Sequence, residues 1–395
     1  MTGITEIRHG RVVTPTRVLE DGRVVLAGSH IVSVSETPVE PLPRAKTVDA
    51  SGLVVMPGLV DLHGDDVEQE LYPRSGARVD ARWALSMADR VNVMAGVTTK
   101  FHAVAFEDAP DDNRSFADAD ELAREIPSMT GALGDNRLHI RCELSRSSVD
   151  AVERVVDDVD ADLVSIMHHA PDDGQFDADE FVRHYVEDRN WPRESVAEAA
   201  IDRDALSRSV RDSLSERIAE LAATLEVPLA SHDDESPADV ERQLDHGAWI
   251  SEYPLTIEAA EHAADRGMTV AMGAPNLVRG GSLWDNLSVR SAIDDGVVDV
   301  LCSDYHPPSL LAAPFVDTGE PFSVRVNRVT QNPAEAAGLH DRGRMEAGAR
   351  ADVLLVNPEP FPVVERVFIE GVEVLTTCDT RTRTVQRTPW RGPGS

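Results

Sequence analysis

The sequence predicts a (β/α)₈ barrel that carries a small β-domain formed from both ends of the chain. The chain has 395 residues, of which 42% are hydrophobic, which suits one large barrel with an appendage. Beyond position 57, eight apolar runs alternate with longer amphipathic stretches, as expected of repeated βα units around a parallel sheet. Short strand patterns also occur at both ends of the chain, and these predict the second domain.

The β-domain is predicted from residues 1–56 together with residues 341–380. Strand patterns cover residues 4–13, 23–27 and 30–35, and the Asp-Gly and Gly-Ser pairs between them are hairpin signals. Strand character returns at residues 350–356 and 364–374. We expect the Arg-, Pro- and Gly-rich tail, residues 381–395, to be disordered.

The barrel is predicted over residues 57–340. Eight strands with intervening helices over roughly 250 residues are typical of a TIM barrel. Two of the expected helices cover residues 211–225 and 256–266. The eight expected strands are residues 59–63, 97–105, 138–144, 163–169, 227–232, 248–253, 269–272 and 298–303.

Composition excludes several classes of protein. The formal charge is −32, which argues against nucleic-acid binding because that requires basic patches. No apolar run approaches the ~20 residues that span a bilayer, and no signal peptide is evident, so we expect a cytoplasmic protein without a membrane partner. The three cysteines form neither a disulfide framework nor a Cys-x-x-Cys metal site.

Imidazoles and carboxylates gather where the expected strands end, which is where a TIM barrel carries its chemistry. Nitrogen and oxygen donors of this kind suit a divalent metal, with Zn²⁺ as the first expectation and Mn²⁺ or Fe²⁺ as alternatives, bound as one or two ions. The candidate metal ligands at these strand ends are His63, Asp65, Glu143, His169, His232 and Asp304.

Each of these residues also has an ordinary structural interpretation. A lone His-x-Asp such as His63 and Asp65 is usually polar surface, and Glu143 could pair with a nearby arginine. Asp304 could cap the helix that follows it, since Asp is a favoured N-cap residue. Lys100 suits a salt bridge or a contact to substrate phosphate. The joint pattern favours the metal site, because every member ends an expected strand.

Several longer motifs resemble the amidohydrolase superfamily. Residues 56–63 (MPGLVDLH) look like its opening motif, and residues 348–355 (GARADVLL) look like its closing motif. Within the superfamily the chain is similar to the phosphonate-pathway diphosphatases, from the first hairpin to about residue 374. The segments that carry this closer resemblance are 139–144 (HIRCEL), 230–234 (ASHDD), 272–282 (MGAPNLVRGGS) and 303–305 (SDY).

The resemblance implies a metal-dependent hydrolase that releases pyrophosphate from α-D-ribose 1-methylphosphonate 5-triphosphate, in the carbon–phosphorus lyase pathway. It implies that the six residues above form the metal site, and Asp304 can then serve as general base. Arginines clamp phosphate bidentately, and Arg74, Arg141 and Arg279 are expected in that role. The amides of Gly280 and Gly281 are expected to approach an anion. The chain departs from the family at residues 283–285 and at His306. These departures bear on fine substrate specificity more than on the type of reaction.

Two alternatives remain open from the sequence. One is a different amidohydrolase that cleaves a cyclic amide or deaminates a base. The other is a catalytically inactive member that serves as a scaffold, against which the intact set of metal-ligating residues argues. The expected partner is a small phosphorylated ribose, and a homo-oligomer is also compatible with the sequence.

The acidic surface leads to a prediction about salt. The charge of −32 with only two lysines, Lys46 and Lys100, is typical of proteins from salt-accumulating organisms. Unscreened self-repulsion destabilises a compact chain, so we expect the melting temperature to rise as potassium chloride is added. Thermal melts from dilute buffer to about 1 M salt measure this. A melting temperature that does not change over this range would contradict the prediction.

Overall fold

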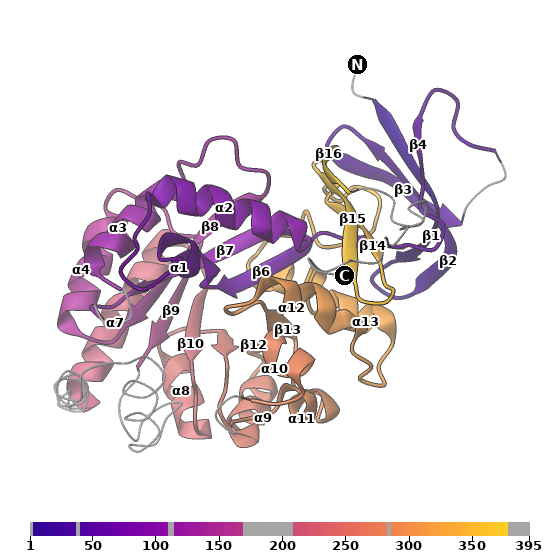
Figure 1. Ribbon diagram of the computed structural model, residues 1–395. Coiled ribbons are helices and arrows are strands. Elements are labelled where there is room, and N and C mark those ends of the chain that lie inside the picture. The colour runs from indigo at the N-terminus through magenta and orange to yellow at the C-terminus, as the bar shows by residue number, and fades with distance from the viewer. Residues whose placement is uncertain (1–2, 37–39, 110–113, 169–207, 283–285, 378–395) are drawn as a thin grey trace, which may run out of the picture.

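A computed structural model describes residues 3–36, 40–109, 114–168, 208–282 and 286–377. His169, residues 283–285 and the tail 381–395, all named above, lie outside these ranges. Within the described ranges there are two eight-stranded sheets, one curved into a near-barrel and one assembled from both chain ends (Figure 1).

The barrel sheet is parallel, and its strands follow one another in sequence order from β6 to β13. All eight strands predicted from the sequence are therefore confirmed. A layer of buried side chains from seven of these strands, with Ala334 and Ala336, fills the inside of the barrel. The strands are β6 (Leu59–Gly64), β7 (Val97–Phe106), β8 (Asp135–Glu143), β9 (Leu163–Met167), β10 (Leu229–His232), β11 (Ile250–Glu252), β12 (Thr269–Gly273) and β13 (Val300–Cys302).

Helices pack around the outside of the barrel, and the largest core cluster lies between them and the strands. Serine, threonine and aspartate cap several of them; Asp80, for example, accepts from two amides at the start of α2. None of the described helices is long and apolar enough to cross a membrane. The helices are α1 (Asp66–Leu71), α2 (Ala81–Met94), α3 (Phe116–Glu125), α4 (Arg146–Val156), α7 (Arg208–Leu225), α8 (Pro237–Asp245), α9 (Ile257–Asp265), α10 (Ala274–Arg279), α11 (Val289–Asp294), α12 (Pro307–Ala312), η3 (Ala313–Phe315), α13 (Phe322–Asn327) and α14 (Gln331–Ala336).

The first and last barrel strands meet around a buried carboxylate, Asp61 of β6. Its Oδ1 accepts from the backbone N–H of Ser303 at 2.9 Å, and its Oδ2 accepts from the Ser303 hydroxyl at 2.5 Å. The Lys100 ammonium donates to the same Oδ2 at 2.7 Å and lies 2.6 Å from Asp66. Next to this cluster, a bridge between Gly64 and Asp304 completes the closure.

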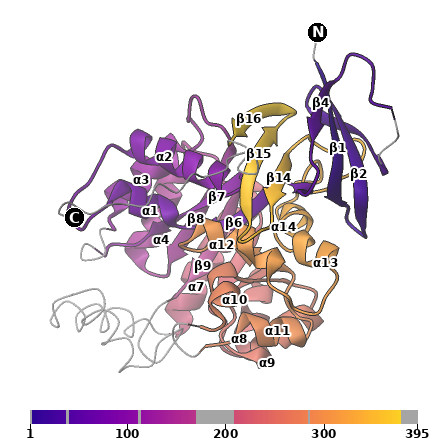
Figure 2. The ribbon, with the colours of Figure 1, turned by 45° about the vertical axis from the view of Figure 1, so that its right-hand side comes forward.

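The second sheet is mixed and joins the two ends of the chain, as the sequence predicted. Its order is β16-β15-β14-β5-β1-β2-β3, with β4 paired to β1. In both views β14 and β15 lie between the N-terminal strands and the barrel (Figures 1 and 2). The strands are β1 (Ile4–Val13), β2 (Val18–Ala27), β3 (His30–Glu36), β4 (Lys46–Asp49), β5 (Val54–Pro57), β14 (Val353–Asn357), β15 (Val363–Ile369) and β16 (Val372–Thr376).

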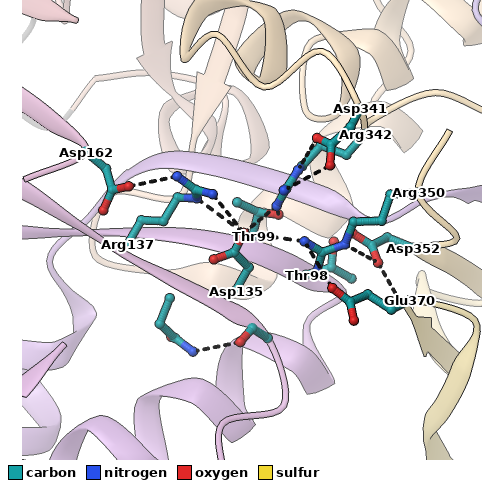
Figure 3. A network of polar contacts seen from close by, with 12 residues as sticks. Thr98, Thr99, Asp135, Arg137, Asp162, Asp341, Arg342, Arg350, Asp352 and Glu370 are labelled. Carbon is teal, nitrogen blue, oxygen red and sulfur yellow. Dashed lines mark hydrogen bonds and ion pairs between the residues drawn. The ribbon is translucent and has the colours of Figure 1, made fainter. Parts of the chain in front are cut away.

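A network of arginines and carboxylates links the barrel to this second sheet (Figure 3). Asp135, the first residue of β8, pairs with Arg137 of the same strand and with Arg342 and Arg350 from the segment that leads to β14. Burial alone would raise the pKa of Asp135, but these guanidinium groups hold it below its usual range. Arg350 also pairs with Asp352, at 2.9 Å, so the network continues to the residue that precedes β14 of the composite sheet.

The buried cluster of Asp61, Asp66, Lys100 and Ser303 is called the closure cluster below. It predicts a large loss of stability in Lys100→Met. This change leaves two buried carboxylates, Asp61 and Asp66, without their cation, which costs about 3–5 kcal/mol of unfolding free energy. Lys46→Met is the matched control, because Lys46 forms a surface ion pair with Glu373 and its loss costs at most about 1 kcal/mol. Urea unfolding at fixed salt measures both. Equal losses in the two variants would contradict a structural role for Lys100.

Candidate active site at the barrel mouth

Two histidines from opposite sides of the barrel share one carboxylate. His63 is the penultimate residue of β6, His232 ends β10, and Glu252 ends β11. The Nδ1 atom of His63 lies 3.0 Å from Glu252 Oε2, and the Nδ1 atom of His232 lies 3.5 Å from the same oxygen. The two imidazoles stack, with ring centroids 5.4 Å apart. Their Nδ1 atoms face Glu252, so the Nε2 atoms are directed elsewhere.

Glu252 also belongs to a buried trio that could hold a metal ion. The ligand atoms of His63, His139 and Glu252 all lie within 4.8 Å of one another. The Nδ1 atom of His139 faces the Leu62 carbonyl at 2.9 Å, and its Nε2 faces the Ser165 hydroxyl at 2.8 Å. A carbonyl only accepts, so the Nδ1 of His139 carries the proton. Burial lowers the pKa of His139 to about 3, which keeps the ring neutral.

A group of carboxylates lies beside these histidines. Burial, with the neighbouring carboxylates of Asp65 and Asp233, raises the pKa of Asp304 to about 7. Burial alone would also raise the pKa of Asp65, but the guanidinium groups of Arg141 and Arg114 hold it below its usual range. Acidic groups that repel one another beside neutral imidazoles fit a divalent cation, which would favour the ionised form of each carboxylate.

The backbone turns in an unusual way at three of the strand ends. Asp233 directly follows β10, Tyr253 directly follows β11, and Asp304 lies two residues beyond β13. Their φ angles are +59°, +55° and +56°. A positive φ is uncommon for residues other than glycine, and such strain concentrates at functional sites. The turn places the Tyr253 ring against His63 and His232, next to Glu252, although regular strand geometry would direct adjacent side chains to opposite faces.

The structure removes one of the ordinary interpretations of the predicted ligands. Asp304 does not cap the next helix, because α12 begins at Pro307 with His306 as its N-cap residue. Asp65 precedes α1, but its side chain makes no capping hydrogen bond. Glu143 ends β8 and lies 3.9 Å from His168 Nδ1, just after β9. His63, Asp65, Glu143, His232 and Asp304 therefore all lie at the same end of the barrel, and His169 is outside the described residues.

The predicted phosphate-binding residues are placed in different ways. Arg141 is 6% exposed, its Nη1 lies 3.5 Å from Asp65, and its Nε and Nη1 atoms make no hydrogen bond within the described chain. Arg74 and Arg279 are exposed. The amides of Gly280 and Gly281 both donate to the Asn276 carbonyl, so they form the C-cap of α10 and would meet a phosphate only if that cap opened.

The sequence left two roles open for Lys100, a salt bridge and a contact to substrate phosphate. The structure places it in salt bridges. Its side chain is 3% exposed, and its ammonium is held by Asp61, Asp66 and Ser303. A Cβ atom on Gly64 would lie 1.8 Å from the Lys100 Nζ, so a larger residue there would displace the ammonium. Lys100 thus contacts the closure cluster rather than open space at the mouth.

Sequence reasoning missed four residues of this site: Glu252, His139, Tyr253 and Arg114. Glu252 and Tyr253 end the expected strand 248–253, so the strand-end rule would have found both had it been applied to every strand. His139 lies inside a motif that was noted, but its contacts cross between strands. Arg114 pairs with Glu68 at 2.8 Å and Glu107 at 3.1 Å, and no local pattern indicates these partners.

Comparison with known proteins identifies the family, although no family model matches the chain. The α-D-ribose 1-methylphosphonate 5-triphosphate diphosphatase of Escherichia coli (strain K12) is 35% identical over an alignment of 349 positions that covers 84% of this chain and 90% of that protein. A 5-methylthioadenosine/S-adenosylhomocysteine deaminase of Halobacterium salinarum is 23% identical over an alignment of 418 positions that covers 93% of this chain and 88% of that protein.

Solved structures agree with the fold. A prolidase complexed with N-methylphosphonate-L-proline has a TM-score of 0.61 at 17% identity, covering 95% of this chain and all of the other. The arrangement of residues at the barrel mouth, the fold, and the sequence identity to most of the Escherichia coli protein lead to one assignment. The chain belongs to the amidohydrolase superfamily and, within it, to the family of the α-D-ribose 1-methylphosphonate 5-triphosphate diphosphatase.

Proposed function

We propose that this protein is a metal-dependent diphosphatase that releases pyrophosphate from α-D-ribose 1-methylphosphonate 5-triphosphate in phosphonate catabolism. The observation that carries the proposal is the 35% identity to the Escherichia coli diphosphatase over most of both chains. The set of imidazoles and carboxylates at the barrel mouth supports it independently, because the fold places catalysis at that end.

The metal would be held by His63, Asp65, His232 and Asp304, with Glu143 and His169 completing the predicted set. A metal-binding histidine commonly donates its second ring N–H to a carboxylate. Glu252 is placed to accept such bonds from both His63 and His232, which leaves their Nε2 atoms for the ion. When bound, a divalent ion lowers the pKa of water and polarises a phosphoryl oxygen. We expect Zn²⁺, with Mn²⁺ or Fe²⁺ as alternatives.

The remaining residues bind the substrate and move protons. Asp304 accepts a proton from the attacking water, the water oxygen bonds to phosphorus, and the anhydride bond between the α- and β-phosphates breaks. Pyrophosphate leaves and the 5-phosphate remains on the ribose. Arg141 is buried with unused donors, and it is the guanidinium best placed to bind a phosphate near Asp65. Arg74 and Arg279 are proposed to contact the outer phosphates.

The reaction is tested with Asp304→Asn. The wild-type protein, loaded with zinc, is expected to release pyrophosphate from the ribose 5-triphosphate, and the variant is expected to lose about 10²–10⁴-fold in kcat because it lacks the general base. Asp317→Asn is the control, since the Asp317 side chain is 87% exposed, and its kcat should match the wild type.

The outcomes separate the proposal from the alternatives. Hydrolysis of a neutral cyclic amide or deamination of a base, without pyrophosphate release, would replace the diphosphatase by another amidohydrolase activity. No turnover of any of these substrates by the metal-loaded wild type would favour the scaffold. Full pyrophosphate release by Asp304→Asn would refute the role of Asp304.

Glu252→Gln tests the metal site without an activity assay. The glutamine carboxamide lacks the charged oxygen that accepts hydrogen bonds from both imidazoles. Zinc affinity should therefore fall about 10–100-fold, as measured by competition with a chromophoric chelator. Glu20→Gln, at a side chain that is 74% exposed, should leave the zinc affinity unchanged. Equal zinc affinity in Glu252→Gln and the wild type would place the metal away from Glu252.

A further inference from the structure

Tyr253 has a hydroxyl group that the rest of the site does not use. Its oxygen is buried and has no hydrogen-bond partner among the described residues. A buried tyrosine hydroxyl normally finds a partner, because an unmade hydrogen bond costs free energy. The exceptions call for a specific explanation, such as a ligand that supplies the missing acceptor.

The Tyr253 ring lies against the histidines and the carboxylate of the candidate site. Tyr253 meets His63 edge-on, with ring centroids 5.1 Å apart, and His232 at 5.2 Å. A Cβ atom built on Gly273 of β12 would lie 3.5 Å from the Tyr253 ring and 3.6 Å from Asp304 Oδ2, so ring and carboxylate border the same glycine. Tyr253 therefore packs against both imidazoles and lies beside the proposed general base.

The backbone holds the ring there under strain. Tyr253 has a φ of +55°, which is an outlier for a bulky residue and is energetically unfavourable. A hydrogen bond of 2.8 Å from its N–H to the Ala271 carbonyl fixes the turn onto β12. A glycine would adopt this turn without cost, so the side chain itself has to supply something the site needs.

We propose that the Tyr253 hydroxyl donates a hydrogen bond to a non-bridging phosphoryl oxygen of the bound substrate, which makes it a catalytic residue for this reaction. The inference rests on the proposed diphosphatase function. A phenol is a neutral donor at neutral pH, so it can stabilise an anionic oxygen without adding charge beside the metal ligands. Donors that are oriented before the substrate arrives contribute strongly to stabilising charge in the transition state.

The test compares Tyr253→Phe with Tyr72→Phe in the zinc-loaded protein. Phenylalanine keeps the ring contacts with His63 and His232 and removes only the hydroxyl. Tyr72 is the matched control, because its hydroxyl donates to Asp118 at 2.9 Å, away from the strand ends. Two quantities are measured: kcat for pyrophosphate release, and the Kd of inorganic pyrophosphate by titration calorimetry. Zinc content and melting temperature are recorded for each variant.

For Tyr253→Phe we expect kcat to fall and the pyrophosphate Kd to rise, each roughly 10–100-fold, with zinc content unchanged. Tyr72→Phe should match the wild type in both quantities. An unchanged pyrophosphate Kd in Tyr253→Phe would overturn the proposal, even if kcat fell, because the acceptor would then be a water and not a phosphoryl oxygen. A loss of zinc would also overturn it, since the role would then be structural.

The two proposals can fail separately. If the wild type binds pyrophosphate but does not release it from the ribose 5-triphosphate, the proposed function fails and the calorimetric comparison still decides the role of Tyr253. If the wild type binds no pyrophosphate, the phosphoryl contact of Tyr253 is refuted together with the phosphate-binding character of the site.

Discussion

The closure of the barrel around Asp61 is the constraint on which the site depends. One carboxylate joins β6 to the residue that follows β13, through the Ser303 amide and hydroxyl, and the Lys100 ammonium balances its charge. A buried carboxylate is tolerable only when it is paired and fully hydrogen-bonded. A side chain on Gly64 would displace the Lys100 ammonium from this position. The same contacts hold the first and last strands of the barrel together.

That closure sets which side chains meet. The Asp304 amide donates to the His63 carbonyl at 3.0 Å, and the Asp65 amide lies 3.2 Å from the Asp304 carbonyl. The proposed general base and the His-x-Asp pair are thus held by backbone hydrogen bonds and not by flexible loops, as a preorganised site requires. Away from the mouth, the Asp135 network attaches the segment before β14 to the start of β8, which is the opposite end of that strand from Glu143 (Figure 3).

The sequence predicted the features that follow from local periodicity and from long motifs. The eight strands and the composite sheet were recognisable because apolar runs and turn residues are local signals. The Glu252 contact with two histidines was not, because it joins strands far apart in the chain. The left-handed turns at Asp233, Tyr253 and Asp304 carry no glycine to announce them. Lys100 could not be assigned to one role, since its partners Asp61 and Asp66 become neighbours only on folding.

The central claim is that one metal-binding centre lies where β6 and β13 close the barrel. Anomalous diffraction at the zinc edge, from crystals of the zinc-loaded protein, tests it most directly. The account predicts a peak within about 2.0–2.6 Å of side-chain atoms of His63, Asp65, His232 and Asp304. A peak coordinated instead by His139 below the mouth, or no peak near His63 with these side chains more than ~8 Å apart, would contradict it.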